Sequence, residues 1–155
     1  MTAVLALDLS ATKAGVALPD GSCMTLTAPK VDIAKKGRDE IGRRLWWWDD
    51  QFTRLFWQHQ PAIVAVEDYA PRAPGMDGRH RTAEVRGIFV VKAMTWDAAI
   101  VDDIGPGTLK KWATGNGNAG KDAMIAEARR RGATVANDDE ADAWLLRAMV
   151  MEMIG

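Results

Sequence analysis

Three short apolar runs near the start of the chain constrain its fold more than any other feature. They lie at residues 4–9, 14–18 and 22–27, and the tripeptide PDG at 19–21 supplies a tight turn before the third run. Short apolar runs separated by turn residues predict strands joined by hairpins. The chain is therefore expected to begin with a three-stranded antiparallel meander.

The remaining sequence alternates between helix and strand patterns. Apolar residues recur at spacings of three and four in the segments expected to be amphipathic helices. Helices are expected over 39–60, 82–96, 106–114, 121–131 and 138–153. Apolar runs at 62–67 and 99–104 are typical of buried strands. This order predicts an α/β fold, a mixed five-stranded sheet flanked by helices, in a single domain over 1–155.

Composition narrows the classes of function. The chain has 20 Lys and Arg residues against 21 Asp and Glu residues, so it lacks the overall basic excess usual in nucleic-acid-binding proteins. Its single cysteine, Cys23, excludes an internal disulfide and a Cys-rich zinc site, and its two histidines form no metal-spaced pair. No apolar run is long enough to span a membrane, and no export signal is recognisable. We expect a cytoplasmic protein with no membrane partner.

Basic residues are nevertheless clustered locally. Arg79 and Arg81 lie in the segment 70–81, whose lack of periodicity predicts a basic loop. Lys110, Lys111 and Lys121 form another group. Each group is a candidate for phosphate contacts, and each is equally well explained as the solvated face of a helix.

Two acidic residues lie in apolar runs, where a charge is costly. Asp8 falls within the first run and Glu67 ends the run at 62–67. Side chains alternate along a strand, so Asp8 shares a face with the apolar residues two and four positions before it. A buried carboxylate costs several kcal/mol unless a partner compensates it, so both residues require an explanation.

A third acidic group opens the last predicted helix. Asp139 and Asp142 are three residues apart and project from one side of this helix. Asp138 is four residues before Asp142, so periodicity does not separate Asp138 from Asp139. Acidic residues in a first turn are also favoured by the helix dipole alone, and this structural explanation stays open.

Convergence of these acids would have a chemical consequence. Mutual repulsion would raise their pKa values and destabilise the fold unless divalent cations neutralised them. Magnesium prefers carboxylate oxygens and retained water, and it leaves positions open for a substrate phosphate. Two such ions can activate a water and stabilise the leaving oxygen of a phosphodiester displacement. The pattern therefore favours nuclease chemistry.

Four segments carry a family resemblance. LALDLSATKAGVAL, IVAVEDY, TLKKWATGNGNAGK and DDEADAWLLRAM resemble, in this order and at these separations, the RuvC family of Holliday-junction resolvases in the RNase H-like superfamily. The resemblance covers nearly the whole chain. It implies that Asp8, Glu67, Asp139 and Asp142 are catalytic acids that bind two magnesium or manganese ions. It also implies a four-way DNA junction as substrate.

The same resemblance implies DNA contacts. It places the family's DNA-contacting lysines at Lys110 and Lys121. Tyr69 lies near the position of an aromatic residue that stacks on bases in the family, offset by one residue. The chain departs from the family after the first acid, where Leu9 and Ser10 replace the usual Pro-Gly.

Two other functions fit the sequence less well than junction cleavage. The stretch GNGNAGKD nearly matches a P-loop, but Asp122 stands where a P-loop needs Ser or Thr, so we expect no nucleotide cofactor. A two-lobed sugar-kinase or actin-like ATPase would need a longer chain. Two alternatives stay open: an endonuclease for flaps or other branched DNA, and a non-catalytic DNA-binding or scaffold module of the same fold.

Tryptophan placement and symmetry give two further expectations. In the run WWW, Trp48 fits the core stripe, so Trp46 or Trp47 should be partly exposed, as a packing or subunit contact or as a platform for stacking bases. A junction with two-fold symmetry suits a homodimer with two active sites. The helix over 82–96, with Gly87, is the candidate dimer face, with a core helix as the alternative.

Overall fold

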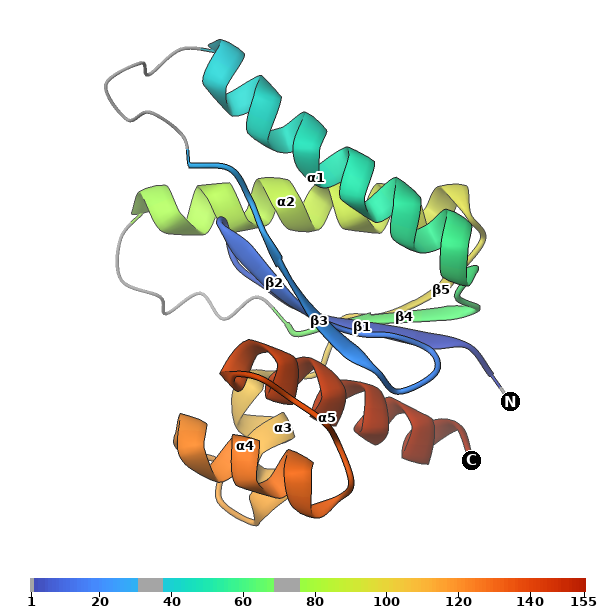
Figure 1. Cartoon of the computed structure of the whole chain (residues 1–155), viewed down its shortest axis with the longest axis vertical. Helices are drawn as coiled ribbons and strands as arrows, with labels where there is room; N and C mark the ends of the chain where they lie inside the picture. The colour runs from blue at the N-terminus through green and yellow to red at the C-terminus, as the bar shows by residue number, and fades with distance from the viewer. Residues whose placement is uncertain (1, 31–37, 69–75) are drawn as a thin grey trace.

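A mixed sheet with helices on both faces forms the molecule, as the sequence predicts (Figure 1). The computed structural model describes residues 2–30, 38–68 and 76–155. The strands are β1 (Val4–Leu9), β2 (Lys13–Ala17), β3 (Cys23–Thr27), β4 (Ile63–Val66) and β5 (Ala99–Val101). They are arranged in the order β3-β2-β1-β4-β5. β1, β2 and β3 form the antiparallel meander, whereas β4 pairs parallel to both β1 and β5.

The helices divide between the two faces of the sheet (Figure 1). One face carries α1 (Arg38–His59) and α2 (Met76–Thr95), and the other carries α3 (Pro106–Thr114), α4 (Lys121–Arg130) and α5 (Asp138–Ile154). Pro106 opens α3, and Gly115 ends it with a φ of 80°, a conformation that favours glycine. In the described part of the chain, no helix is both long enough and apolar enough to cross a bilayer.

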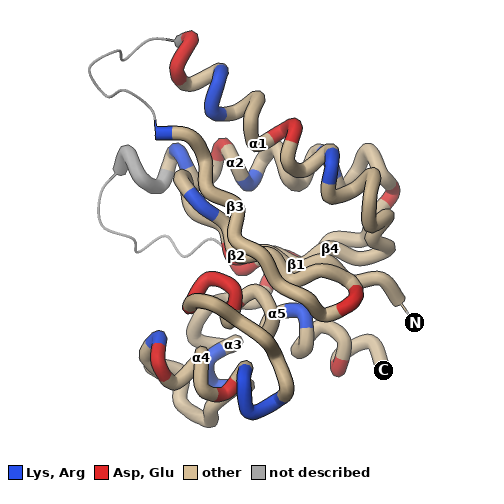
Figure 2. Tube along the Cα trace, viewed as in Figure 1, with Lys and Arg blue, Asp and Glu red and all other residues tan. Residues whose placement is uncertain are grey.

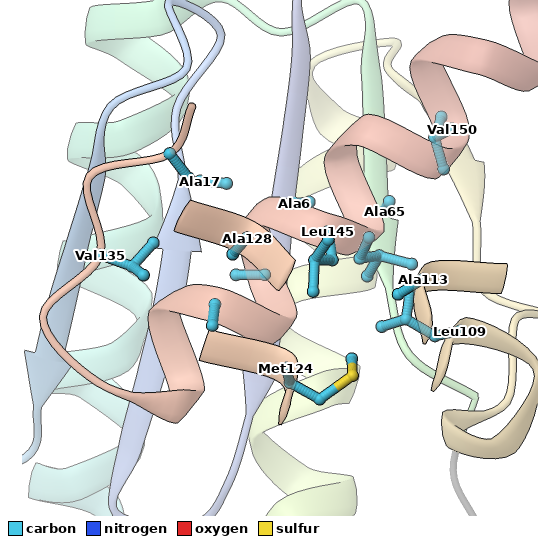
Figure 3. Close-up of a cluster of buried hydrophobic side chains, with 14 of the residues drawn as sticks. Ala6, Ala17, Ala65, Leu109, Ala113, Met124, Ala128, Val135, Leu145 and Val150 are labelled. Atoms are coloured by element: carbon cyan, nitrogen blue, oxygen red, sulfur yellow. The ribbon is translucent and has the colours of Figure 1, made fainter. Parts of the chain in front are cut away.

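Each face of the sheet has its own hydrophobic core. Alternation along β1 sends Leu5 and Leu7 into the core beneath α1 and α2, and sends Val4 and Ala6 into the core beneath α5. Figure 3 shows the second of these, in which Ala6 and Ala65 of the sheet meet Leu145 of α5. Asp8 and Glu67 continue the same alternation, so both are placed toward α5.

Two boundaries differ from the sequence expectation by more than one residue. Residues 69–75 lie outside the described part, but the basic segment predicted as a loop over 70–81 is helical from Met76 onward. His80 and Arg81, at the end of this segment, are polar and exposed, so they add no apolar periodicity to the sequence. The strand predicted over 99–104 ends at Val101, because exposed Asp102 and Asp103 follow it.

Candidate active site

The four predicted acids lie at one rim of the sheet, although they come from three distant segments. In the register of β1 and β4, Leu7 is opposite Val66, so the next residues, Asp8 and Glu67, are neighbours at the carboxyl ends of two parallel strands. α5 lies across this face, and its first turns carry Asp139 and Asp142. The negative charges of Asp142 and Asp139 both act on Asp8, which is consistent with one shared cluster.

Burial raises the pKa values of three of these carboxyl groups. Desolvation, followed by repulsion from the neighbouring aspartates, raises the pKa of Asp8 to about 7. The same two causes, with Asp8 and Asp142 as the charged neighbours, raise the pKa of Glu67 to about 8. Desolvation likewise raises the pKa of Asp142 to about 6. Without added positive charge, this cluster retains protons near neutral pH.

Lysines from three elements surround the acids. Lys13, at the tip of the β1–β2 hairpin, forms an ion pair with Asp139. Lys121, the first residue of α4, lies 2.5 Å from Asp138, and its hydrogen bond lowers the pKa of that carboxyl group. The positive charge of Lys110 on α3 lowers the pKa values of both Glu67 and Asp142. The rim is therefore acidic at its centre and basic at its border.

The start of α5 is held by a network of hydrogen bonds. The Asn137 side chain caps the helix by accepting from the backbone N–H of Glu140 at 2.9 Å. The buried Glu140 carboxylate accepts from Thr25 Oγ1 on β3 and from the backbone N–H of Ala136, both at 2.8 Å. These bonds fix the direction from which Asp139 and Asp142 face the sheet.

Gly15 on β2 allows α5 to approach the sheet this closely. A Cβ atom built on Gly15 would lie 2.0 Å from the carbonyl oxygen of Asp139, a separation that real Cβ atoms do not show. Gly15 is also the register partner of Asp8. Only glycine at this position permits the backbones of β2 and α5 to meet beside the acids.

The donor set is chemically suited to a hard divalent cation. The acids offer carboxylate oxygens, which magnesium and manganese prefer, and Asp142 Oδ1 is buried without a hydrogen-bond partner among the described residues. As they stand, however, no three acidic, histidine or cysteine side chains of the described chain are grouped closely enough to ligate one ion. Asp138 and Asp139 instead face Lys121 and Lys13.

The predicted DNA-contacting residues are distributed around this rim. Lys110 and Lys121 face the acids, whereas Lys111 and Arg81 are exposed to solvent. Figure 2 shows the basic positions of α3 and α4 in the same layer as the acidic start of α5. Tyr69 lies outside the described residues, as does the side chain of Arg79.

Sequence reasoning missed two residues that shape the site. Lys13 pairs with Asp139, and the available signal was a lysine at the mouth of a hairpin whose other strand carries Asp8. Glu140 anchors α5, and the available signal was its position three residues after Asn137, the spacing of a capping box. Both signals are local, but their partners are remote in sequence.

Comparison with known proteins agrees with the family resemblance of the sequence. The family model described as crossover junction endodeoxyribonuclease RuvC matches residues 4–146. A search of curated protein sequences finds no match.

Three solved structures share the fold. A Thermus thermophilus RuvC in complex with a Holliday junction substrate has a TM-score of 0.74 at 18% identity, covering 99% of this chain and 96% of that chain. A second Thermus thermophilus RuvC structure gives 0.68 at 19% identity, with coverages of 98% and 96%. The yeast mitochondrial Holliday junction resolvase gives 0.58 at 14% identity, with coverages of 95% and 76%. The sheet and its helices therefore form an RNase H-like fold, and the chain belongs to the RuvC family of crossover junction endodeoxyribonucleases.

Proposed function

We propose that the protein is a metal-dependent endonuclease that hydrolyses phosphodiester bonds in four-way DNA junctions. One observation carries the proposal: acids from β1, the end of β4 and α5 meet at one rim, with Lys110 and Lys121 beside them. A buried acidic cluster is costly to the fold, and a cation-dependent reaction at this rim accounts for that cost. Family membership and the junction-bound structural neighbour support the choice of substrate.

Asp8, Glu67, Asp139 and Asp142 are the residues that would hold two magnesium or manganese ions. Asp139 is preferred to Asp138 because its charge acts more strongly on Asp8. When bound, the ions supply an activated water and stabilise charge on the leaving oxygen. To contribute to such a site, Asp139 would have to give up its ion pair with Lys13.

The lysines act on the DNA. Lys110 and Lys121 attract the phosphodiester to the rim, and the charge of Lys110, which acts on Glu67 and Asp142, would offset negative charge that builds up on the phosphate during displacement. Exposed Lys111 and Arg81 add backbone contacts farther from the acids. Tyr69 and Arg79 are further candidate contacts by sequence alone.

A homodimer would place two such sites on the two strands that must be cut. On α2, Gly87, Val91 and Met94 are spaced by four and three residues on one side of the helix, and Val91 and Met94 are 60% and 70% exposed. Among the described residues, a Cβ built on Gly87 would meet no atom within 4 Å apart from the backbone of its own helix, so a second helix has room to approach. Light scattering should give a dimer for the wild type and a monomer for Val91→Glu. A wild-type monomer, with and without DNA, would reject this arrangement.

The decisive experiment uses labelled four-way junction, flap and linear duplex, each with and without magnesium. We expect magnesium-dependent cleavage of the junction, and Asp8→Asn should bind the junction but cut it at least 100-fold more slowly. Asp97→Asn, a control at an exposed turn, should cut normally. Preferential cutting of the flap would favour the branched-DNA alternative, and binding without cleavage by the wild type would favour the scaffold alternative.

A further inference from the structure

A pocket of about 550 Å³ lies between the segment that follows β3 and residues 40–54 of α1, outside the acidic rim. Its walls include Pro29 and Lys30, which follow β3, and Arg43, Trp46 and Trp47 of α1. Pockets of this size commonly hold small organic ligands or single residues of a polymer. The pocket takes no part in the chemistry assigned above.

The aromatic wall of the pocket is both rigid and accessible. Trp47 packs edge-on against Trp48, with ring centroids 4.9 Å apart, and Trp48 is fully buried in the core. Trp46 is 75% exposed, so its indole face is available to a ligand. An aromatic face on a fixed helix is a suitable platform for stacking a planar ring.

Positively charged side chains lie beside these tryptophans in the pocket lining. Lys30 is exposed, and the Arg43 side chain is 77% exposed and lies 4.0 Å from Glu40. Such exposed ion pairs contribute little to stability, so Arg43 is available to an anion. Arg44 differs, because it is buried and bonded to Glu84 at 2.7 Å, which makes it structural. The pocket lining therefore combines the Trp46 indole with the positive charges of Lys30 and Arg43. It also includes the carboxylates of Glu40 and Asp50, and Asp50 is paired with Arg54 at 2.9 Å.

The pocket is connected to the acidic rim by a short path across the edge of the sheet. The backbone N–H of Ala28, just before Pro29, donates to the carbonyl of Thr12 at 2.8 Å. The next residue, Lys13, is paired with Asp139. A DNA segment that crosses the hairpin tip at Thr12 and Lys13 can thus reach both the acids and the pocket.

We infer that this pocket binds an unpaired base of the branched DNA substrate, with the base stacked on Trp46 and its flanking phosphates held by Lys30 and Arg43. The inference rests on the proposed nuclease function, because that function brings branched DNA, a polyanion whose bases can unpair at the branch, to this edge. Trp46 and the cations supply what single-stranded DNA requires: a stacking face and backbone charge.

The test measures binding of branched DNA with one single-stranded arm to the Asp8→Asn protein, with and without Trp46→Ala. Trp46→Ala should weaken binding by about 5- to 100-fold, the range for loss of one stacked base. Trp57→Ala is the matched control: Trp57 is 73% exposed on the same side of α1, about 16 Å along the helix and outside the pocket. It should bind like the parent, and Trp46→Phe should restore most of the affinity.

Two further measurements check the assignment of charge and stacking. The double variant Lys30→Gln, Arg43→Gln should lower the slope of log affinity against log salt by about 2. A 2-aminopurine in the single-stranded arm should lose fluorescence on binding to the parent protein but not to Trp46→Ala.

The outcomes separate this inference from the proposed function. If wild-type protein binds and cuts branched DNA while Trp46→Ala matches Trp57→Ala in affinity and quenching, the pocket is not a base site and only this inference falls. If Trp46→Ala leaves DNA affinity unchanged but alters self-association, Trp46 belongs to a subunit contact, and this result also overturns the inference. If the wild type binds no branched DNA, both proposals fail.

Discussion

The two faces of the sheet are filled by different kinds of side chain. On the α5 face, nine of the 17 buried core residues among those described are alanines and none is aromatic. The 16 buried residues on the α1 and α2 face include Trp48, Phe52, Phe56 and Phe89, whose rings contact one another. Small residues permit close backbone approach, as at Gly15, whereas aromatic residues bury more apolar area. The comparison indicates that one face positions the acids, whereas the other buries the larger aromatic side chains.

A change of pH should distinguish the two faces most strongly, because among the described residues only the α5 face carries buried carboxyl groups with raised pKa values. For Asp8, Glu67 and Asp142 the folded-state pKa, about 6 to 8, exceeds the ordinary value, so the folded protein binds more protons than the unfolded chain. The free energy of unfolding should therefore fall by several kcal/mol from pH 4.5 to pH 8 in metal-free protein. Urea titrations in EDTA measure this change.

Two controls make the pH experiment specific. Asp8→Asn should flatten the pH dependence, because one of the titrating groups is gone. Saturating magnesium should stabilise the wild type at pH 8, since an ion that binds only the folded state favours that state. Equal urea midpoints at the two pH values would contradict the charge assignment of this face.

The stability of the other face is tested with Phe52→Ala. Phe52 is fully buried and contacts both Trp48 and Phe89, so its truncation should lower the free energy of unfolding by about 3 to 5 kcal/mol. Below the new unfolding temperature, cleavage by the remaining folded protein should be close to normal. A large loss of cleavage without loss of stability would mean that this face also positions the site.

Gly15→Ala should have the opposite profile. The added methyl group meets the Asp139 backbone, so α5 must shift, at a cost of about 1 to 3 kcal/mol in stability. If these acids are catalytic as proposed, a shift of about 1 Å in their position should reduce cleavage by about 100-fold. A Cβ built on Gly42 of α1 would meet no atom of the described residues within 4 Å apart from its own helix backbone. Gly42→Ala should therefore be neutral or slightly stabilising. Full activity in Gly15→Ala would show that close approach is not required.

The smallest expected effect is that of Glu140→Gln. The amide keeps the size of the side chain but weakens its bonds to Thr25 and to the Ala136 backbone, which should cost about 1 kcal/mol. Calorimetric titration should also show weaker magnesium binding, because the start of α5 loosens. Glu152→Gln, exposed near the far end of α5, serves as the control and should change neither quantity.

Much of the fold follows from local patterns. β1 and α3 have the predicted boundaries, because β1 is a short apolar run followed by polar residues, and Pro106 and Gly115 mark the helix ends. The first turns of α2 were missed because exposed His80 and Arg81 give no apolar periodicity. Lys13 was not identified as part of the site because its partner, Asp139, is 126 residues away in the chain.

The sequence by itself determined the order of the elements, the apolar faces of the strands and the positions of acids near the ends of β1 and β4 and at the start of α5, since these depend on spacing along the chain. Only the tertiary structure decided which lysine faces which acid, how far burial raises each pKa, and where Trp46 and Trp47 meet Lys30 across a pocket. These properties depend on desolvation and on distances between segments remote in sequence. Local patterns do not contain that information, because it arises only when the helices pack on the sheet.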